Sequence, residues 1–327
     1  MRYVVVTVGN ALFDILLTLE DRHESYTFQK DDQTLCIKIG EKIPAQTATL
    51  STGGGACRIA IALSRLGEKT AVFAAVGQDA LAQSIVSVLV EENVETSHIQ
   101  RTLQTTSLAM GLSCQSERTL FTHHSEKQPD FDFSGVVTDW VYLAALGGEW
   151  EKGHEQVVEY VKTNNLKLAF NPGASQFAKG TKSFSETLLQ TDILFVNKQE
   201  AEKIAGRKTD SITGLLKALL DLGPKRVVIT DGKKGSYGID TDGKMYKLPI
   251  MNEPVVEKTG AGDAYAAGFL FAMMSNKPLP VAMQWGTALA ASVVSKIGGH
   301  HGLLTAQELE EMLKKPTLSK IEPLAET

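Results

Sequence analysis

Residues 254–274 contain the strongest candidate for chemistry: an extended stretch, a glycine turn and then a long apolar helix. Glycines let the backbone turn tightly, and unpaired amides at a helix start form an anion site together with the helix dipole. These amides belong to Gly260, Ala261, Gly262 and Asp263. A carboxylate at this point can act as a base beside the bound anion, although an N-capping Asp263 fits the local pattern equally well.

A loop after another apolar run is suited to nucleotide phosphates. Thr230, Gly232 and Gly235 follow the β-branched run at 226–230, so the backbone can pass close to a ligand there. An ordinary β-turn explains the same residues, and the local sequence leaves both interpretations open.

A third candidate pairs Asn197, at the end of an apolar run, with Glu200 near the start of a helix. Magnesium keeps several waters and uses few carboxylates, so Glu200 is a candidate ligand for hydrated Mg²⁺. A first-turn glutamate that complements the helix dipole is the alternative.

Two further sites lie early in the chain. Asp14 follows the first predicted strand, and a glycine loop with Gly54 and Gly55 opens a predicted helix. Taken alone, each site is compatible with ordinary loop chemistry.

These candidates sit in an alternation of short apolar runs and helical patterns, which predicts a mainly parallel sheet covered by helices on both faces. The predicted strands are 3–8, 70–77, 140–146, 166–170, 192–197 and 226–230. The predicted helices are 56–67, 80–93, 153–165, 211–223, 261–275, 279–297 and 305–314.

Two regions break the alternation, at about 15–50 and 106–123. Both have the pattern of antiparallel strands outside the main sheet, the second with a turn around Ser116 and Glu117, and we expect them to form a small β-sheet lid. A hairpin is also predicted to turn at Asp242 and Gly243.

Composition excludes several classes of protein. The 327 residues include 33 Lys+Arg and 38 Asp+Glu, and this formal net charge of −5 argues against nucleic-acid binding. No apolar run reaches the ~18 residues of a membrane span, and the apolar N-terminal stretch is broken by polar residues, unlike a signal peptide. Three separated cysteines without a CxxC pair favour a reducing compartment, so we expect a cytoplasmic protein.

Taken in order, the five motifs resemble those of the PfkB carbohydrate kinase family, within the ribokinase-like superfamily. The early glycine motif runs from Gly53-Gly54 to Arg65-Leu66-Gly67, and the other motifs match at Asn197 with Glu200, at Thr230, Gly232 and Gly235, and at Gly260 to Asp263. The resemblance covers essentially the whole chain. It implies one α/β/α domain over 1–327, with the lid inserted in two pieces.

The resemblance also implies roles for the residues of an ATP-dependent phosphotransferase. Asp263 would deprotonate a substrate hydroxyl, and the helix-start amides would stabilise the transferring phosphoryl group. Glu200 would act on Mg²⁺ and Asn197 on the phosphates. The residues implied to bind ATP further are Thr230, Gly232, Gly235 and Thr287, and those implied to bind the substrate are Asp14, Gly54, Gly55 and Arg58.

This sequence departs from the family pattern in the half of the site that reads the sugar. Arg58 stands where the family usually has an asparagine. A guanidinium facing the pocket would bind a substrate phosphate or carboxylate, whereas an Arg58 turned to solvent would leave sugar contact to other residues. Glu257 and Lys258 replace an aspartate and a threonine next to a monovalent-cation site found in many members, which leaves activation by K⁺ open.

The acceptor therefore has several interpretations. A small sugar leads, a sugar phosphate follows if Arg58 binds an anion, and an adenosine-type nucleoside is the alternative on the same fold. A nucleoside base needs aromatic platforms near the lid, for which the candidates are Tyr26, Phe28, Phe121 and His123. A sugar-binding regulator without catalysis is the rival from another class, and a homodimer through exposed lid edges stays open.

Overall fold

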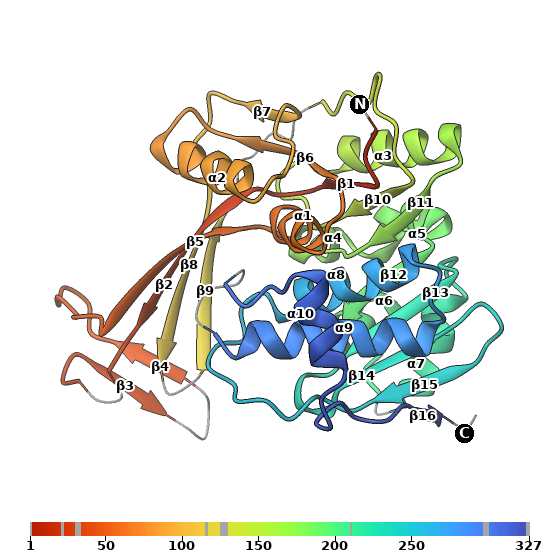
Figure 1. Cartoon of the computed structure of the whole chain (residues 1–327). Coiled ribbons are helices and arrows are strands. Elements are labelled where there is room, and N and C mark those ends of the chain that lie inside the picture. Colours follow the sequence, from red (N-terminus) through yellow and green to blue (C-terminus); the bar gives the residue numbers. More distant parts are fainter. Residues whose placement is uncertain are drawn as a thin grey trace.

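A central sheet between two helical layers is the main feature of the computed structural model, which describes residues 2–20, 23–29, 34–114, 117–124, 130–209, 211–296 and 301–324 (Figure 1). Within these residues the sheet has ten strands in the order β16-β15-β14-β13-β12-β11-β10-β1-β6-β7. The parallel strands are β1 (Val5–Val8), β6 (Thr70–Val76), β7 (Ile99–Arg101), β10 (Trp140–Leu143), β11 (Lys167–Phe170), β12 (Ile193–Asn197) and β13 (Arg226–Thr230). The antiparallel strands are β14 (Ser236–Ile239), β15 (Met245–Leu248) and β16 (Glu322–Leu324).

Helices cover both faces of this sheet, so its central strands are apolar on both sides. Along β10, Trp140 and Tyr142 pack into the core of one face, and Val141 and Leu143 pack into the core of the other. One layer holds α1 (Gly55–Arg65), α2 (Ala80–Glu91), α8 (Ala261–Met274), α9 (Leu279–Val294) and α10 (Ala306–Leu313). The other holds α3 (Glu151–Asn164), α4 (Ala174–Lys179), α5 (Ser185–Gln190), α6 (Lys198–Ala205) and α7 (Ile212–Leu220). The predicted α/β/α architecture is confirmed.

A second, smaller sheet projects from one side of the central sheet (Figure 1). Its order is β5-β2-β8-β9, built from β2 (Leu12–Thr18), β5 (Thr47–Gly53), β8 (Ser107–Cys114) and β9 (Glu117–His123). A separate hairpin joins β3 (Tyr26–Gln29) and β4 (Thr34–Ile37). The two segments that break the β–α alternation therefore come together in one sheet; the turn predicted at Ser116 lies outside the described residues.

The expectation of purely antiparallel strands in this sheet is wrong for one pair. β2 pairs antiparallel with β5, and β8 with β9, but β2 and β8 run parallel, with Leu12 opposite Ser107. The reason is where the two segments start. Both follow parallel strands of the central sheet, β1 and β7, and so leave the same edge of it in the same direction.

Sequence patterns missed the shortest elements. The turn between 171 and 192 contains α4 and α5, each of six residues, where no helix was predicted. Helices this short show little periodicity, and their stability comes from packing, here through Phe177 of α4 against the core and Leu188 of α5 within it. β7 and β16 were missed for the same reason, because each has three residues.

Asp79 ties the start of α2 to the chain that enters β8. Its carboxylate accepts hydrogen bonds from the Ala82 amide at 2.9 Å and from the Thr106 amide at 2.8 Å. The Thr106 hydroxyl donates to it at 2.6 Å and accepts from the Gly77 amide at 3.0 Å. Burial acts against the charged carboxylate, but these bonds outweigh it and lower the pKa of Asp79.

Replacing Asp79 should therefore destabilise the protein in a pH-dependent way. We expect Asp79→Ala to lower the free energy of unfolding by about 2 kcal/mol at pH 7, because a helix cap and two loop bonds are lost. A carboxylate with a lowered native pKa stabilises above its unfolded pKa of about 3.9, and the contribution disappears as the pH falls through the native pKa. Urea unfolding at pH 7 and pH 3 measures both; an equal loss at the two pH values would contradict this account.

Candidate active site

Three adjoining cavities form a cleft at the carboxyl ends of the parallel strands, within the described residues. The small-sheet cavity lies between the small sheet and the starts of α1 and α8 and encloses about 250 Å³. The central cavity of about 380 Å³ shares Gly260 with it. The outer cavity of about 340 Å³ shares Thr230, Gly262 and Tyr265 with the central one. Crevices at the carboxyl ends of such strands are where α/β sheets bind ligands.

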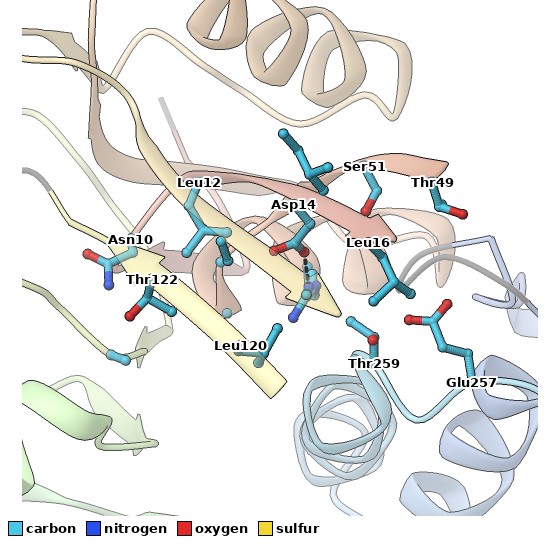
Figure 2. A pocket seen from close by; sticks show the side chains of 18 of the residues that line it. Asn10, Leu12, Asp14, Leu16, Thr49, Ser51, Leu120, Thr122, Glu257 and Thr259 are labelled. Atoms are coloured by element: carbon cyan, nitrogen blue, oxygen red, sulfur yellow. Dashed lines mark hydrogen bonds and ion pairs between the residues drawn. The ribbon is translucent and has the colours of Figure 1, made fainter. Parts of the chain in front are cut away.

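The lining of the small-sheet cavity mixes polar and apolar side chains. Figure 2 shows Asp14 and Leu16 from β2, Thr49 and Ser51 from β5, and Leu120 and Thr122 from β9. Successive side chains of a strand point to opposite faces, so the lining residues are mostly every second one of each strand; Ile15 of β2 also lines the cavity. Asn10, just past β1, is held in place because its side-chain oxygen accepts the Gly147 amide at 2.9 Å.

Arg58 occupies the middle of this arrangement. Its Nη1 donates to Oδ2 of Asp263 at 3.0 Å, and its Nη2 forms an ion pair with Oδ2 of Asp14, drawn as a dashed line in Figure 2. The three side chains are only 13–16% exposed. Burial opposes the charge, but the two carboxylates outweigh it and raise the pKa of Arg58. An Arg58 turned to solvent is therefore wrong.

The helix start at α8 carries the candidate base. Gly260 is its N-cap in the left-handed region, at φ 77°, and no side chain caps the helix. The interpretation of Asp263 as the capping residue is therefore wrong, because its carboxylate binds Arg58 instead. The Ala261 amide makes a long bond of 3.4 Å to the Lys258 carbonyl. The start of α8 therefore presents backbone amide donors at a glycine turn, next to the Asp263 carboxylate.

The glycine motif lets the chain pass closely between these groups. Gly54 has φ 91°, and a Cβ there would lie 2.0 Å from the Asn10 carbonyl oxygen. A Cβ on Gly55, the first residue of α1, would lie 3.3 Å from Oδ1 of Asp263. Both glycines line the small-sheet cavity.

Asn197 and Glu200 form a capping box at the start of α6. The Asn197 side chain accepts the Glu200 amide and the Glu200 carboxylate accepts the Asn197 amide, both at 2.9 Å. Glu200 is therefore a first-turn glutamate that supports the start of α6, as the alternative interpretation expected. The same carboxylate also lines the central cavity with Asp263. Burial, with a contribution from Asp263, raises the pKa of Glu200.

The outer cavity collects the loop predicted for nucleotide phosphates. Thr230, Gly232 and Gly235 line it together with Thr287 of α9. Gly235 has φ 91°, and a Cβ there would lie 2.1 Å from the Leu248 carbonyl oxygen, so the turn requires glycine. The apolar lining residues include Ile250, Val255, Ala290, Ala291 and Val294.

The charged residues of the outer cavity favour an anion. Lys233 and Lys258 line it. The one acid among its described lining residues, Glu253, is paired with Lys315 at 3.2 Å.

Sequence analysis did not single out every polar residue of the cleft, and two examples are Asn171 and His124. Asn171 follows β11 and lines the central cavity, held by a 2.8 Å bond from its side-chain nitrogen to the Phe195 carbonyl. It obeys the strand-end pattern that singled out Asn197, so the signal was present. His124 lines the small-sheet cavity, and burial, with the nearby His123, lowers its pKa.

The aromatic candidates for a base platform lie elsewhere. Tyr26 packs in a small apolar cluster with Leu19 and Cys114, and Phe28 lies beside it. Phe121 and His123 alternate with Leu120 and Thr122 on β9 and therefore point to the other face of the small sheet. None of the described residues lining the small-sheet cavity is Phe, Tyr or Trp.

Comparison with known proteins identifies the family. The model of the pfkB family carbohydrate kinases matches residues 25–306. The chain belongs to the pfkB family. It is therefore a phosphotransferase with an alcohol group as acceptor, and the resemblance seen in the motifs is confirmed.

Proteins similar to this pfkB protein in sequence or fold include a ribokinase and a nucleoside kinase. Ribokinase of Haemophilus influenzae is 27% identical over 288 residues, which are 85% of this chain and 92% of that protein. The structure of Arabidopsis thaliana ribokinase complexed with ribose and ATP has a TM-score of 0.79 at 23% identity, covering 96% and 100% of the two chains. A Methanocaldococcus jannaschii nucleoside kinase has a TM-score of 0.73 at 23% identity, covering 95% and 98%. The described part of this chain has no helix long and apolar enough to span a bilayer.

Proposed function

We propose that this pfkB protein transfers the γ-phosphoryl group of ATP to a hydroxyl of a small sugar or sugar-like alcohol, with Asp263 as the base. One observation carries the proposal. Asp263 and Gly260 stand at the junction between a small cavity lined by hydroxyl-binding groups and a cleft lined by backbone donors and lysines. The acceptor cavity, the base with the helix-start amides, and the nucleotide cleft thus follow one another. Phosphoryl transfer requires this order of acceptor, base and phosphate donor.

Each cavity then has a role. The acceptor binds in the small-sheet cavity through Asp14 and Arg58, over the backbone of Gly54 and Gly55. The phosphates bind between Asn197 and the amides of α8, and the loop after β13 holds the nucleotide. The residues assigned to these last two parts are Gly260, Ala261, Gly262, Thr230, Gly232, Gly235 and Thr287. The small sheet covers the acceptor as a lid over a single domain, which would keep water from the reaction.

The lining of the small-sheet cavity favours a sugar over a nucleoside. A nucleoside base buries its flat faces against rings or broad apolar surfaces. The described lining instead offers carboxylates, hydroxyls and three leucine side chains in about 250 Å³. The retained Asp263 and the uncapped helix start favour an enzyme over a sugar-binding regulator.

Replacing the base tests the proposal. We expect Asp263→Asn to lower kcat by about 1,000-fold or more, because general-base catalysis contributes 10²–10⁴ and Asn cannot accept the proton. ATP affinity, measured by calorimetry, should change little. Asp242→Asn, at an exposed hairpin turn, is the matched control and should keep wild-type turnover on a panel of sugars, nucleosides and sugar phosphates. Turnover that survives in Asp263→Asn would refute the assignment.

Mg²⁺ fits the central cavity through Glu200. The described residues contain no group of three or more His, Cys, Asp or Glu side chains that could hold a metal ion by itself. A single carboxylate beside a phosphate site suits Mg²⁺, which keeps most of its waters and binds substrate phosphates. Such an ion would neutralise the phosphate charge.

A matched pair of capping boxes separates this role from helix capping. Glu308 caps α10 as Glu200 caps α6, with its carboxylate accepting the Thr305 amide at 2.8 Å. Gln also serves at this position of a capping box, so Glu200→Gln and Glu308→Gln should each leave the free energy of unfolding within about 0.5 kcal/mol. Only Glu200→Gln should raise the Mg²⁺ concentration for half-maximal turnover, by about 10-fold. An unchanged Mg²⁺ titration would remove Glu200 from the site.

We further propose that the outer face of the small sheet binds a second copy of the chain. Leu50, Met110 and Phe121 lie in one row across this sheet, on the face away from Thr49 and Leu120. Leu50 is 60% exposed and Phe121 53% exposed. An exposed apolar sheet face of this kind is typical of a self-complementary interface.

Light scattering tests the dimer. The wild type should have twice the mass of one chain. Phe121→Lys should have the mass of a single chain, because burying a lysine in the interface without an opposite charge beside it is costly. Leu103→Lys is the control, since Leu103 is 95% exposed and lies off the sheet. A wild type with the mass of one chain would contradict the proposal.

A further inference from the structure

The charge of the lining residues changes sign from one end of the cleft to the other. Lys233 and Lys258 line the outer cavity, whereas Asp14 and Glu257 line the small-sheet cavity, with Asp263 at its border. Arg58 is the one Lys or Arg among the described residues that line the small-sheet cavity. The contacts of Arg58 therefore determine whether the small-sheet cavity can bind an anion.

The charge of Arg58 is already balanced. One terminal nitrogen binds Asp263 at 3.0 Å and the other binds Asp14. Two carboxylates thus share one guanidinium that is 13% exposed, and a third carboxylate, Glu257, lies on the same cavity. An anion entering this space would meet three carboxylates and a cation that has no uncompensated charge to offer.

The other positive element of the cavity is balanced as well. The start of α1 points its amides and its dipole into the cavity at Gly55. A Cβ on Gly55 would lie 3.3 Å from Oδ1 of Asp263, so a carboxylate already faces this helix start. His124 adds no compensating charge near neutral pH, because burial lowers the pKa of its imidazole.

Uncharged hydroxyl groups suit the same surroundings. They donate to carboxylates and accept from nitrogen donors, and Nε of Arg58 is buried without a hydrogen-bond partner in the described part of the chain. Leu12, Leu16 and Leu120 offer apolar contacts for the C–H groups of a polyol. The cavity therefore matches a neutral molecule that carries both hydroxyl and C–H groups.

We infer that the acceptor is an uncharged polyol, and that Arg58, committed to Asp14 and Asp263, excludes sugar phosphates and sugar acids rather than binding them. This inference rests on the proposed function. It chooses between the two substrate classes that the arginine at position 58 left open in the sequence, and it makes Asp14 a specificity-determining residue as well as a hydroxyl ligand.

Calorimetry with matched pairs tests the inference. The pairs are ribose with ribonate, glucose with gluconate, and fructose with fructose 6-phosphate, each titrated into the full-length protein with and without a non-hydrolysable ATP analogue. We expect the neutral member of at least one pair to bind. In each such pair the anionic member should bind at least about 10-fold more weakly, and no anionic member should bind where its neutral partner does not. Tighter binding of any anionic member, or binding by no member, overturns the inference.

Two variants locate the cause of the selectivity. Asp14→Asn releases part of the charge of Arg58, so the affinity ratio of anionic to neutral member should rise by about 10-fold, even if both affinities fall. Thr122→Val is the matched control, because it changes the cavity lining without changing its charge, and the ratio should stay the same. An unchanged ratio in Asp14→Asn overturns the inference.

Measuring turnover with the same panel distinguishes failure of the proposed function from failure of the charge-selectivity inference. If the neutral members bind but no member is phosphorylated, the proposed function fails and the charge selectivity stands. If a phosphorylated or acidic member is the better acceptor, the inference fails and the proposed function stands.

Discussion

One buried guanidinium joins the three elements that enclose the small-sheet cavity. Arg58 belongs to α1, Asp14 to the small sheet and Asp263 to α8, and the ion pairs between them are largely shielded from water. Removing one partner from a buried ion pair usually costs ~3–5 kcal/mol, because the other charge stays buried. Here a single cation neutralises two carboxylates, so one side chain links the small sheet to α8.

Much of the cleft follows from a rule that can be applied to the sequence. Polar residues that follow apolar runs mark the carboxyl ends of parallel strands, and these ends share one edge of the sheet. Asn197 and Thr230 end β12 and β13 and were predicted this way, and Asn10 and Asn171 obey the same rule. Asn171 was overlooked because the neighbouring turn continues into α4, a helix too short to show a period.

The pairing inside the cavity could not be predicted. Arg58 is 44 residues from Asp14 and 205 residues from Asp263, and no spacing rule connects them. The local pattern places Arg58 one turn into α1, which is compatible both with a ligand-binding arginine and with an exposed one. Only the packing of α1 between the small sheet and α8 turns it toward two carboxylates. For the same reason β2 and β8 were expected to be antiparallel, because strand direction depends on where each segment leaves the central sheet.

The helix starts at the cleft differ from several others in how their amides are capped. Among the described residues, four helices begin with a side-chain cap, from Asp79, Asn197, Ser211 and Thr305. By contrast, α1 and α8 begin at Gly54 and Gly260, and neither has a side-chain cap. Asp263 faces the start of α1 and so satisfies its positive end from across the cavity. Asp263 also lies in the first turn of α8, but its carboxylate binds Arg58 and does not cap the α8 amides. In the proposed function, a capping side chain at Gly260 would take the place of a phosphoryl oxygen, and the glycine leaves the α8 amides without a side-chain cap.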